Sequence, residues 1–238
     1  MKARIKFRKY GVLRFIGHLD VMRYFQKVMR RADIPIAFTG GYSPHMILSF
    51  ASPLGIGLTS DGEYLDIELT APVDSREAVK RMNETGVEGI EVLSIRQIAE
   101  EKKMTGMTIL AGADYLISIR KGSLPENWKQ SFENFMNQKE IRVLKQTKRS
   151  EKEVDIRPLI YSWEFRGDSI YVQCAAGSAQ NLKPDLIMET FLKQESIPED
   201  SVRFHFHRLE MYADGAAVGV GEGLVTLESL GSDMTEIQ

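Results

Sequence analysis

The feature that most constrains the fold is an order of strand and helix patterns that occurs twice along the chain. Residues 3–9 alternate apolar and basic side chains, as a half-buried strand does, and residues 18–32 carry apolar side chains at helical spacing. Strand pieces at 36–38 and 46–50, a strand at 63–69, a helix from Asp74 to Gly86 and a strand at 90–95 complete the first set. This β-α-β-β-α-β order is typical of a ferredoxin-like module.

The second half of the chain repeats the pattern without residue-level identity. It predicts, in order, strand 115–120, helix 125–137, strands 141–148 and 169–174, helix 184–194 and strand 202–212. We therefore predict an α+β protein of two tandem ferredoxin-like modules. Module 1 spans 1–96, a linker spans 97–110, module 2 spans 111–212, and 213–238 forms a flexible acidic tail.

A single cysteine, Cys174, limits the chemistry that the chain can perform by itself. It excludes an internal disulfide, and it cannot supply the thiolates of an iron–sulfur cluster or a structural zinc site. His205 and His207 share a strand face but lack a third ligand, so we expect no metal site and no cofactor. No apolar run reaches the ~20 residues of a membrane span, and the N-terminal residues do not form a signal peptide. We expect a cytoplasmic protein in which Cys174 is an inert core residue.

The charge is distributed unevenly along the chain. Residues 1–50 contain ten Lys and Arg against two Asp, whereas residues 161–238 contain five basic residues against thirteen acidic ones. Two sets of basic side chains are candidates for binding RNA or another anion: Arg4, Lys6 and Arg8 on the first strand, and Arg23, Lys27, Arg30 and Arg31 on one face of the first helix. The alternatives are cross-strand pairing of the first set with Tyr64, Asp66 and Glu68, and a solvated face for the second.

Three stretches carry most of the unusual residues. The first is GVLRFIGHLD at 11–20, the second is FTGGYSPHMILSFASPLGIGL at 38–58 with SDGEYLD at 60–66, and the third is VDIRPLI at 154–160. Together they resemble the uncharacterised radical SAM-linked protein family, whose members show rFxxHLDxxR, GFnPHP-xxSFa-PLxxG-xS-GEyxDi and vDiRPli segments. The resemblance covers residues 3–210. The chain departs from it at Gly17, at Tyr42-Ser43 and at Met46.

This resemblance implies a radical SAM protein as partner, because the family is named for occurring beside or fused to such proteins. The chemistry would then belong to the partner, because this chain lacks the CxxxCxxC cluster motif. It also singles out six polar residues, for which we predict one shared pocket: His18, Asp20, Tyr42, His45, Ser60 and Glu63. His18 and Asp20 fall in the first turn of a helix, where they could contact an anionic substrate or could simply cap the helix.

Three classes of function remain open on these observations. The favoured one is an accessory protein that binds a radical SAM enzyme or presents its RNA or ribosome-related substrate. The alternative is a metal-independent RNA-processing or RNA-modifying enzyme in which His18 and His45 form an acid/base pair. A scaffold without either activity is the third.

Overall fold

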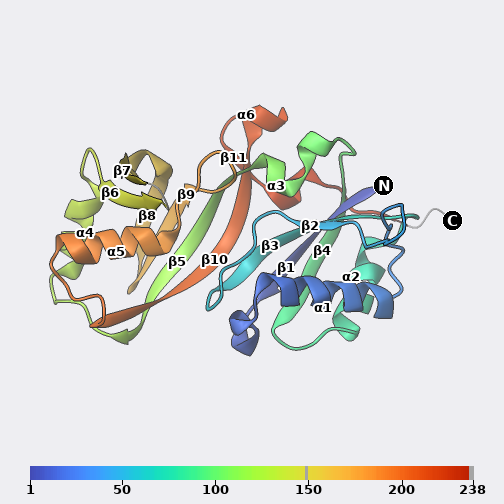
Figure 1. The fold of residues 1–238 in the computed structure, drawn as a ribbon, viewed down its shortest axis with the longest axis horizontal. Coiled ribbons are helices and arrows are strands. Elements are labelled where there is room, and N and C mark those ends of the chain that lie inside the picture. The colour runs from blue at the N-terminus through green and yellow to red at the C-terminus, as the bar shows by residue number, and fades with distance from the viewer. Residues whose placement is uncertain (148–149, 236–238) are drawn as a thin grey trace. The chain divides into compact units, whose positions relative to one another are not determined.

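The computed structural model describes residues 1–147 and 150–235, and the chain divides into two compact units. Unit 1 consists of Met1–Gly112 with Arg208–Gln238, and unit 2 of Ala113–His207. The fold is a mixed α/β one with helices and a large mixed sheet (Figure 1). Strands β5 (Leu110–Gly122) and β10 (Val202–Asp214) contribute residues to both units. The chain therefore passes between the units inside two strands, which differs from the predicted linker at 97–110.

Unit 1 contains the predicted first set of elements. They are β1 (Lys2–Lys9), α1 (His18–Arg31), β2 (Leu48–Phe50), β3 (Thr59–Glu68), α2 (Ser75–Glu84) and β4 (Ile90–Ile98). Strand β1 lies between β4 and β3 and is antiparallel to both, and the short β2 pairs with β3. The next strand beyond β3 is β10.

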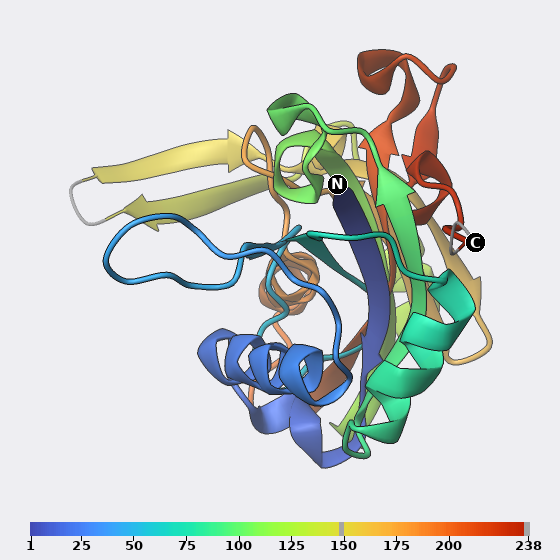
Figure 2. The same cartoon turned by 90° about the vertical axis from the view of Figure 1, so that its right-hand side faces the viewer.

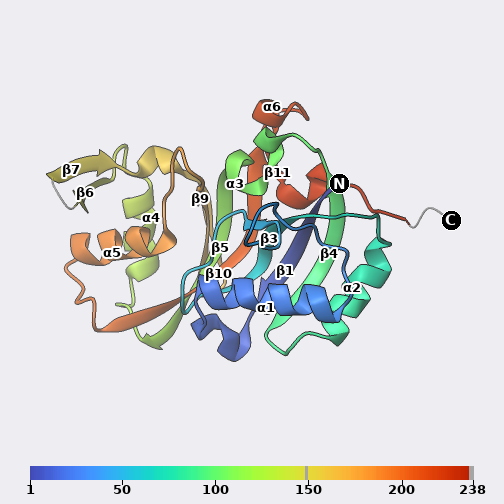
Figure 3. The same cartoon turned by 45° about the vertical axis from the view of Figure 1, so that its right-hand side comes forward.

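The core of unit 1 lies between this sheet and the helices α1 and α2, and Figure 3 shows α1 lying across the strands. Alternation along β1 places Ile5 and Phe7 in the core, as predicted, and the Phe7 ring meets that of Phe25 from α1 edge to face at 4.7 Å. Helix α1 begins after Gly17, which is its N-cap residue. Helix α2 begins after Asp74, whose carboxylate accepts a hydrogen bond from the Glu77 amide at 2.9 Å.

Residues 213–235 are an ordered part of unit 1, in contrast to the predicted flexible tail at 213–238, whose last three residues lie outside the described ones. They form α6 (Gly215–Val218), β11 (Leu224–Thr226), which pairs with β10, and the 3-10 helix η4 (Leu227–Leu230). Leu227 is fully buried, and Met234 belongs to the core cluster. The backbone amide of Met234 donates to the Ser75 hydroxyl at 2.9 Å. A few apolar residues, Leu227 and Met234 among them, anchor this segment in unit 1. The prediction of a flexible tail relied on the glycine-rich, acidic composition of the segment as a whole.

The predicted linker is structured as well. Its first two residues end β4, and a 3-10 helix, η2 (Lys102–Met104), and a short helix, α3 (Gly106–Ile109), follow before β5 begins. The backbone amide of Gly106 donates to the Asp66 carboxylate of β3 at 2.6 Å, which fixes this segment to the sheet of unit 1.

Unit 2 has one hairpin more than the sequence predicted. Its elements after β5 are α4 (Trp128–Met136), β6 (Arg142–Thr147), β7 (Ser150–Asp155), β8 (Ile160–Arg166), β9 (Ser169–Ala175) and α5 (Pro184–Gln194). The sheet order is β10-β5-β9-β8, while β6 and β7 form a separate two-stranded ribbon, drawn in yellow in Figure 2.

The strand predicted at 141–148 therefore pairs with β7 and not with β9; residue 148 lies outside the described residues. Strand β8 takes its place in the sheet, because its inward aromatic side chains meet the helices: the ring of Trp163 lies 5.7 Å from that of Phe132. Cys174 is a buried residue of β9, as predicted, and its thiol donates to the Leu182 carbonyl at 3.2 Å.

Candidate functional site

Lys9 is a buried lysine at the end of β1. Ile5, Phe7 and Lys9 occupy successive inward positions of the strand, and only 2% of Lys9 is exposed. Its ammonium donates to the Ile16 carbonyl at 3.0 Å. Burial lowers the pKa of Lys9, the positive charge of Arg208 lowers it further, and the charge of Glu63 opposes both. A lysine placed in this way is a functional-site candidate.

Glu63 and Arg208 form a buried ion pair next to Lys9. Arg208 Nε lies 2.8 Å from Glu63 Oε1 and Nη2 lies 2.5 Å from Oε2, and Nη2 also donates to the Ser52 carbonyl at 2.8 Å. Both side chains are almost completely buried. A bidentate geometry of this kind offsets part of the cost of removing two charges from water. It also engages both oxygens of Glu63, so the carboxylate is committed to Arg208.

A small pocket connects these residues to the surface. Lys9 and Glu63 lie at its inner end, and the exposed His18 and Pro53 lie at its mouth. The other lining residues are apolar, namely Phe7, Val21, Phe50 and Leu54. The inner space is about 10 Å³ for a water-sized molecule, enough for about one water. The ring of His18 lies edge to face against that of Phe50, with centroids 4.8 Å apart, which fixes the imidazole at the entrance.

The structure brings together only part of the predicted six-residue site. His18 and Glu63 line the same pocket, and Ser60 is the cross-strand neighbour of Lys9. The Ser60 hydroxyl is fully buried and has no hydrogen-bond partner within residues 1–147 and 150–235. Three of the six predicted residues are thus near Lys9.

The other three predicted residues lie on exposed surfaces and line no part of this pocket. Asp20 pairs with Arg23 at 3.3 Å, and Tyr42 is fully exposed. The imidazole Nδ1 of His45 lies 3.1 Å from the Thr39 hydroxyl of its own loop. None of the contacts found in the described part of the chain joins His45 to His18.

Two residues of the site, Lys9 and Arg208, were missed by sequence reasoning. A signal existed for Lys9, because it continues the inward alternation of Ile5 and Phe7. Arg208 is 145 positions away from its partner Glu63 and had no local signal.

Three basic residues of β1, Arg4, Lys6 and Arg8, are paired with acidic side chains of unit 1. Arg4 is 2% exposed and forms a bidentate pair with Asp66, and Lys6 pairs with Glu210 at 2.7 Å and with Glu228 at 3.0 Å. Arg8 pairs with Glu91 on the surface. The cross-strand alternative is therefore the better description of these residues. Arg4 and Lys6 are not available to RNA, because both are paired with acidic side chains and are shielded from solvent.

The C-terminal segment supplies much of this neutralisation. Glu228 of η4 accepts from Lys6 and from the Ser94 hydroxyl at 2.6 Å, and Glu210 accepts from the Tyr64 hydroxyl at 2.6 Å. Burial would lower the pKa of Lys6, but its bonds to the two carboxylates raise it overall. Burial and the neighbouring carboxylate of Glu210 raise the pKa of Tyr64. The polar side chains on this face of the sheet thus form a network of ion pairs and hydrogen bonds.

The basic residues of α1 are arranged differently. Arg23, Lys27, Arg30 and Arg31 are all exposed and lie on the side of the helix away from its buried residues. Apart from the Asp20–Arg23 pair, no ion pair of these four side chains occurs in the part of the chain that the structure describes. They form a basic face, which we call the α1 basic face.

Comparison with known proteins places the chain in a family. The sequence profile described as "Uncharacterized protein conserved in bacteria (DUF2344)" matches residues 2–184, more than half of the chain. The chain belongs to the DUF2344 family. The site described above falls within the matched range, except for Arg208.

No curated protein matches this DUF2344 chain. A solved structure described as a crystal structure of a Cbf5-Nop10-Gar1 complex contains a similar chain, with 14% identity and a TM-score of 0.44. The match covers 88% of this chain and 48% of that chain, so the DUF2344 chain spans about half of its length. A similarity at this level supports no inference about fold or function.

The third sequence stretch of the DUF2344 chain has a structural role. The Asp155 carboxylate accepts from the backbone amides of Ile141 at 2.8 Å and Arg157 at 3.0 Å, and Arg157 donates to the Ile160 carbonyl. These bonds hold the turn between β7 and β8. These bonds give Asp155 and Arg157 a structural role in the turn, which requires no bound ligand.

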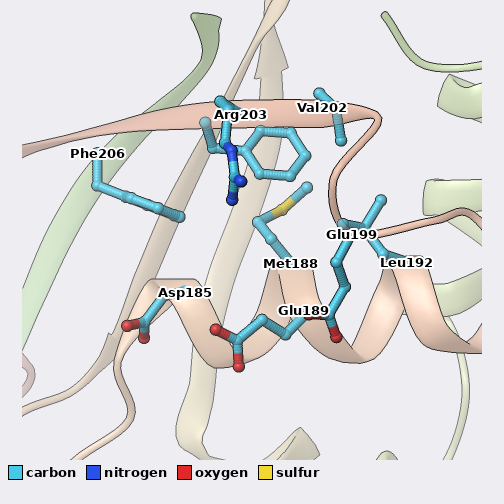
Figure 4. Close-up of a pocket in the computed structure, with 9 residues that line it drawn as sticks. Asp185, Met188, Glu189, Leu192, Glu199, Val202, Arg203 and Phe206 are labelled. Atoms are coloured by element: carbon cyan, nitrogen blue, oxygen red, sulfur yellow. The ribbon is translucent and has the colours of Figure 1, made fainter. Parts of the chain in front are cut away.

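Unit 2 contains a separate hollow of about 200 Å³ beside α5 (Figure 4). Asp185, Glu189 and Glu199 place carboxylates around it, with Arg203 opposite and Met188 at its base. Burial and the charges of Asp185 and Glu199 raise the pKa of Glu189. No group of three His, Cys, Asp or Glu side chains among the described residues has the geometry of a metal site. No helix in the described ranges is long and apolar enough to cross a bilayer.

Proposed function

We propose that the chain is an RNA-binding accessory protein and that the α1 basic face is its RNA contact. The observation that carries this proposal is the contrast between the two basic sets of unit 1. Those of β1 are paired with acidic residues, whereas Lys27, Arg30 and Arg31 are exposed without an ion pair among the described residues. Phosphate binding needs such a row of solvent-facing cations and little else.

A radical SAM enzyme is the partner that we propose for this accessory role. The support is the resemblance of the residue stretches at 11–20, 38–66 and 154–160 to the radical SAM-linked family. A second support is chemical, because the chain has one thiol and this thiol is buried, so a cluster would have to belong to another protein. Affinity purification of the tagged chain from its own cells tests this part: a radical SAM protein should co-purify with it, and its absence would reject this partner.

For the fold we propose that both units are ferredoxin-like. The support in unit 1 is the antiparallel order β4-β1-β3 with β2 on the far edge of β3, and in unit 2 it is the order β10-β5-β9-β8. In this classification the β6–β7 ribbon and the C-terminal segment are additions to the two modules.

The RNA proposal is tested by titrating single-stranded RNA over a range of salt. Four phosphate contacts predict a log–log slope of about −3, and each lost contact flattens it by about 0.7. We expect Arg23→Glu and Lys27→Glu each to weaken binding and to flatten the slope. The matched controls are Arg76→Glu and Lys80→Glu on the exposed side of α2, which should leave both unchanged. Equal effects of the two pairs, or no binding at low salt, would reject the α1 basic face as the RNA contact.

One observation favours an enzyme as the second candidate. His18 stands at the mouth of a pocket that ends at a buried lysine, an arrangement that could transfer protons. The predicted partner His45 contacts Thr39 instead. In this candidate the isolated chain would turn over RNA without added metal, and His18→Gln would abolish turnover while His45→Gln would not.

A further inference from the structure

The ammonium of Lys9 lacks a carboxylate partner, although it is buried. Its hydrogen bond goes to the Ile16 carbonyl, and no acidic side chain of the described residues lies within ion-pair distance of it. Glu63, the carboxylate whose charge acts on Lys9, has both oxygens bound to Arg208. An isolated charge is costly in such a place unless a counter-ion joins it. The lowered pKa of Lys9 has the same origin.

The titratable groups around this ammonium come from three strands and one helix. Lys9 belongs to β1, Glu63 to β3, Arg208 to β10 and His18 to α1. The loop that follows β2 contributes only the Ser52 carbonyl, which faces Arg208, and the apolar Pro53 and Leu54. The pocket therefore presents one uncommitted cation at the end of an apolar channel.

The size of the pocket selects among anions. Its inner space holds about one water, and about 250 Å³ are empty when its open mouth is included. A single oxygen of a planar group can reach Lys9, while the body of the ligand stays near His18 and Pro53. The walls next to that body are the side chains of Val21, Phe50 and Leu54. A tetrahedral phosphate with its firmly held hydration shell suits these apolar walls less well.

We propose that this pocket binds a small carboxylic acid as its carboxylate, with the ammonium of Lys9 as the counter-ion and the imidazole of His18 at the mouth. This site is distinct from the α1 basic face, and it would stand if RNA binding failed. The carboxylate of the ligand supplies the negative charge beside Lys9, because the carboxylate of Glu63 is already paired with Arg208. Binding of the carboxylate favours the protonated form of Lys9. At a pH at which the Lys9 amine is neutral in the free protein, binding is therefore accompanied by the uptake of a proton. Affinity then falls as the pH rises through the pKa of Lys9 in the complex.

Calorimetric titration of the full chain with sodium acetate tests the proposal, and acetamide serves as the neutral control of the same shape. We expect one acetate per chain, no heat from acetamide, and a heat of binding that varies with the ionisation enthalpy of the buffer. Lys9→Met should weaken acetate binding by at least about tenfold. Lys27→Met, which removes an exposed lysine of α1, should leave acetate binding unchanged.

Four results would overturn the proposal: no acetate binding, equal binding of acetamide, an unaffected Lys9→Met variant, or tighter binding of inorganic phosphate than of acetate. If Lys9→Met does not fold, the wild-type chain still decides the question. Acetate must then raise its melting temperature, and acetamide at matched ionic strength must not. The two proposals are separable, because Lys9→Met should leave the salt dependence of RNA binding intact and Lys27→Glu should leave acetate binding intact.

Discussion

Arg4 of β1 and Asp66 of β3 face each other in a bidentate ion pair that is closed from solvent, with Nε–Oδ1 at 2.7 Å and Nη2–Oδ2 at 2.9 Å. The remaining donors of Arg4 reach the Leu227 carbonyl at 3.1 Å and the Met104 carbonyl at 3.1 Å. One guanidinium therefore joins the sheet, the segment before β5 and the C-terminal segment of unit 1.

Arg4→Met should destabilise the protein strongly. The substitution leaves the carboxylate of Asp66 buried and deprives two carbonyls of their donor, and breaking a buried pair in this way costs about 3–5 kcal/mol. Arg8→Met, which removes a partly exposed pair with Glu91 on the same strand, should cost about 0–1 kcal/mol. Denaturant unfolding of both variants measures the difference. Similar losses for the two would show that the Arg4 pair is no more important than a surface contact.

Tyr64 should make the protein sensitive to alkali. Burial and Glu210 raise the pKa of its hydroxyl in the folded state above the unfolded value of about 10. The stabilisation is therefore complete below about pH 10 and is lost as the pH rises toward the folded-state pKa. Lys6, whose pKa is also raised, acts in the same direction.

Tyr64→Phe removes one of these two titrations, so its unfolding free energy should fall less steeply than that of the wild type between about pH 9 and about pH 11. Lys6→Met should flatten the same range independently. The idea fails if Tyr64→Phe and the wild type lose stability in parallel over this interval.

Leu227→Ala should cost about 2–5 kcal/mol, because it opens a cavity under η4 at a fully buried position. The matched control is Val220→Ala, at an exposed position of the same C-terminal segment, which should change the stability by less than about 0.5 kcal/mol. Thermal unfolding of the two variants compares them. A small effect of Leu227→Ala would mean that the segment is dispensable for unit 1.

Glu189→Gln should stabilise the protein at neutral pH. The pKa of Glu189 is raised by burial and by Asp185 and Glu199, so its ionised form is less favourable in the folded chain than in the unfolded one. The gain should appear as the pH rises above the unfolded value of about 4.3 and should vanish in more acidic solution. Glu195→Gln, at the exposed C-cap of the same helix, is the control. Melting temperatures at two pH values suffice, and a gain at acidic pH only would refute the assignment.

The sequence predicted the elements that depend on local patterns. The alternation in β1 and the start of α2 at Asp74 are set by neighbouring residues, and the structure confirms both. The burial of Cys174 was also predictable, because its strand is apolar at alternate positions.

The features that the sequence did not reveal depend on residues far apart in the chain. Arg208 reaches Glu63, and Glu228 reaches Lys6, over separations of 145 and 222 residues. The same limitation explains β8, whose place in the sheet depends on the rings of Trp163 and Phe165 meeting Phe132 of α4. The alternation of apolar and polar residues alone could not show that β8, and not a strand of the neighbouring charged hairpin, joins the sheet.

The pairing of Glu63 with Arg208 sets an order of events during biosynthesis. Domains generally fold from the N-terminus as the chain emerges from the ribosome. Residues 1–112 would appear first, but the partner of Glu63 follows only after all of unit 2 has been translated. Until then the carboxylate of Glu63 has no guanidinium partner, and the residues of η4 have not been synthesised. A chain cut short inside unit 2 would lack Arg208 and η4, so the pocket of unit 1 would remain without the guanidinium that pairs with Glu63.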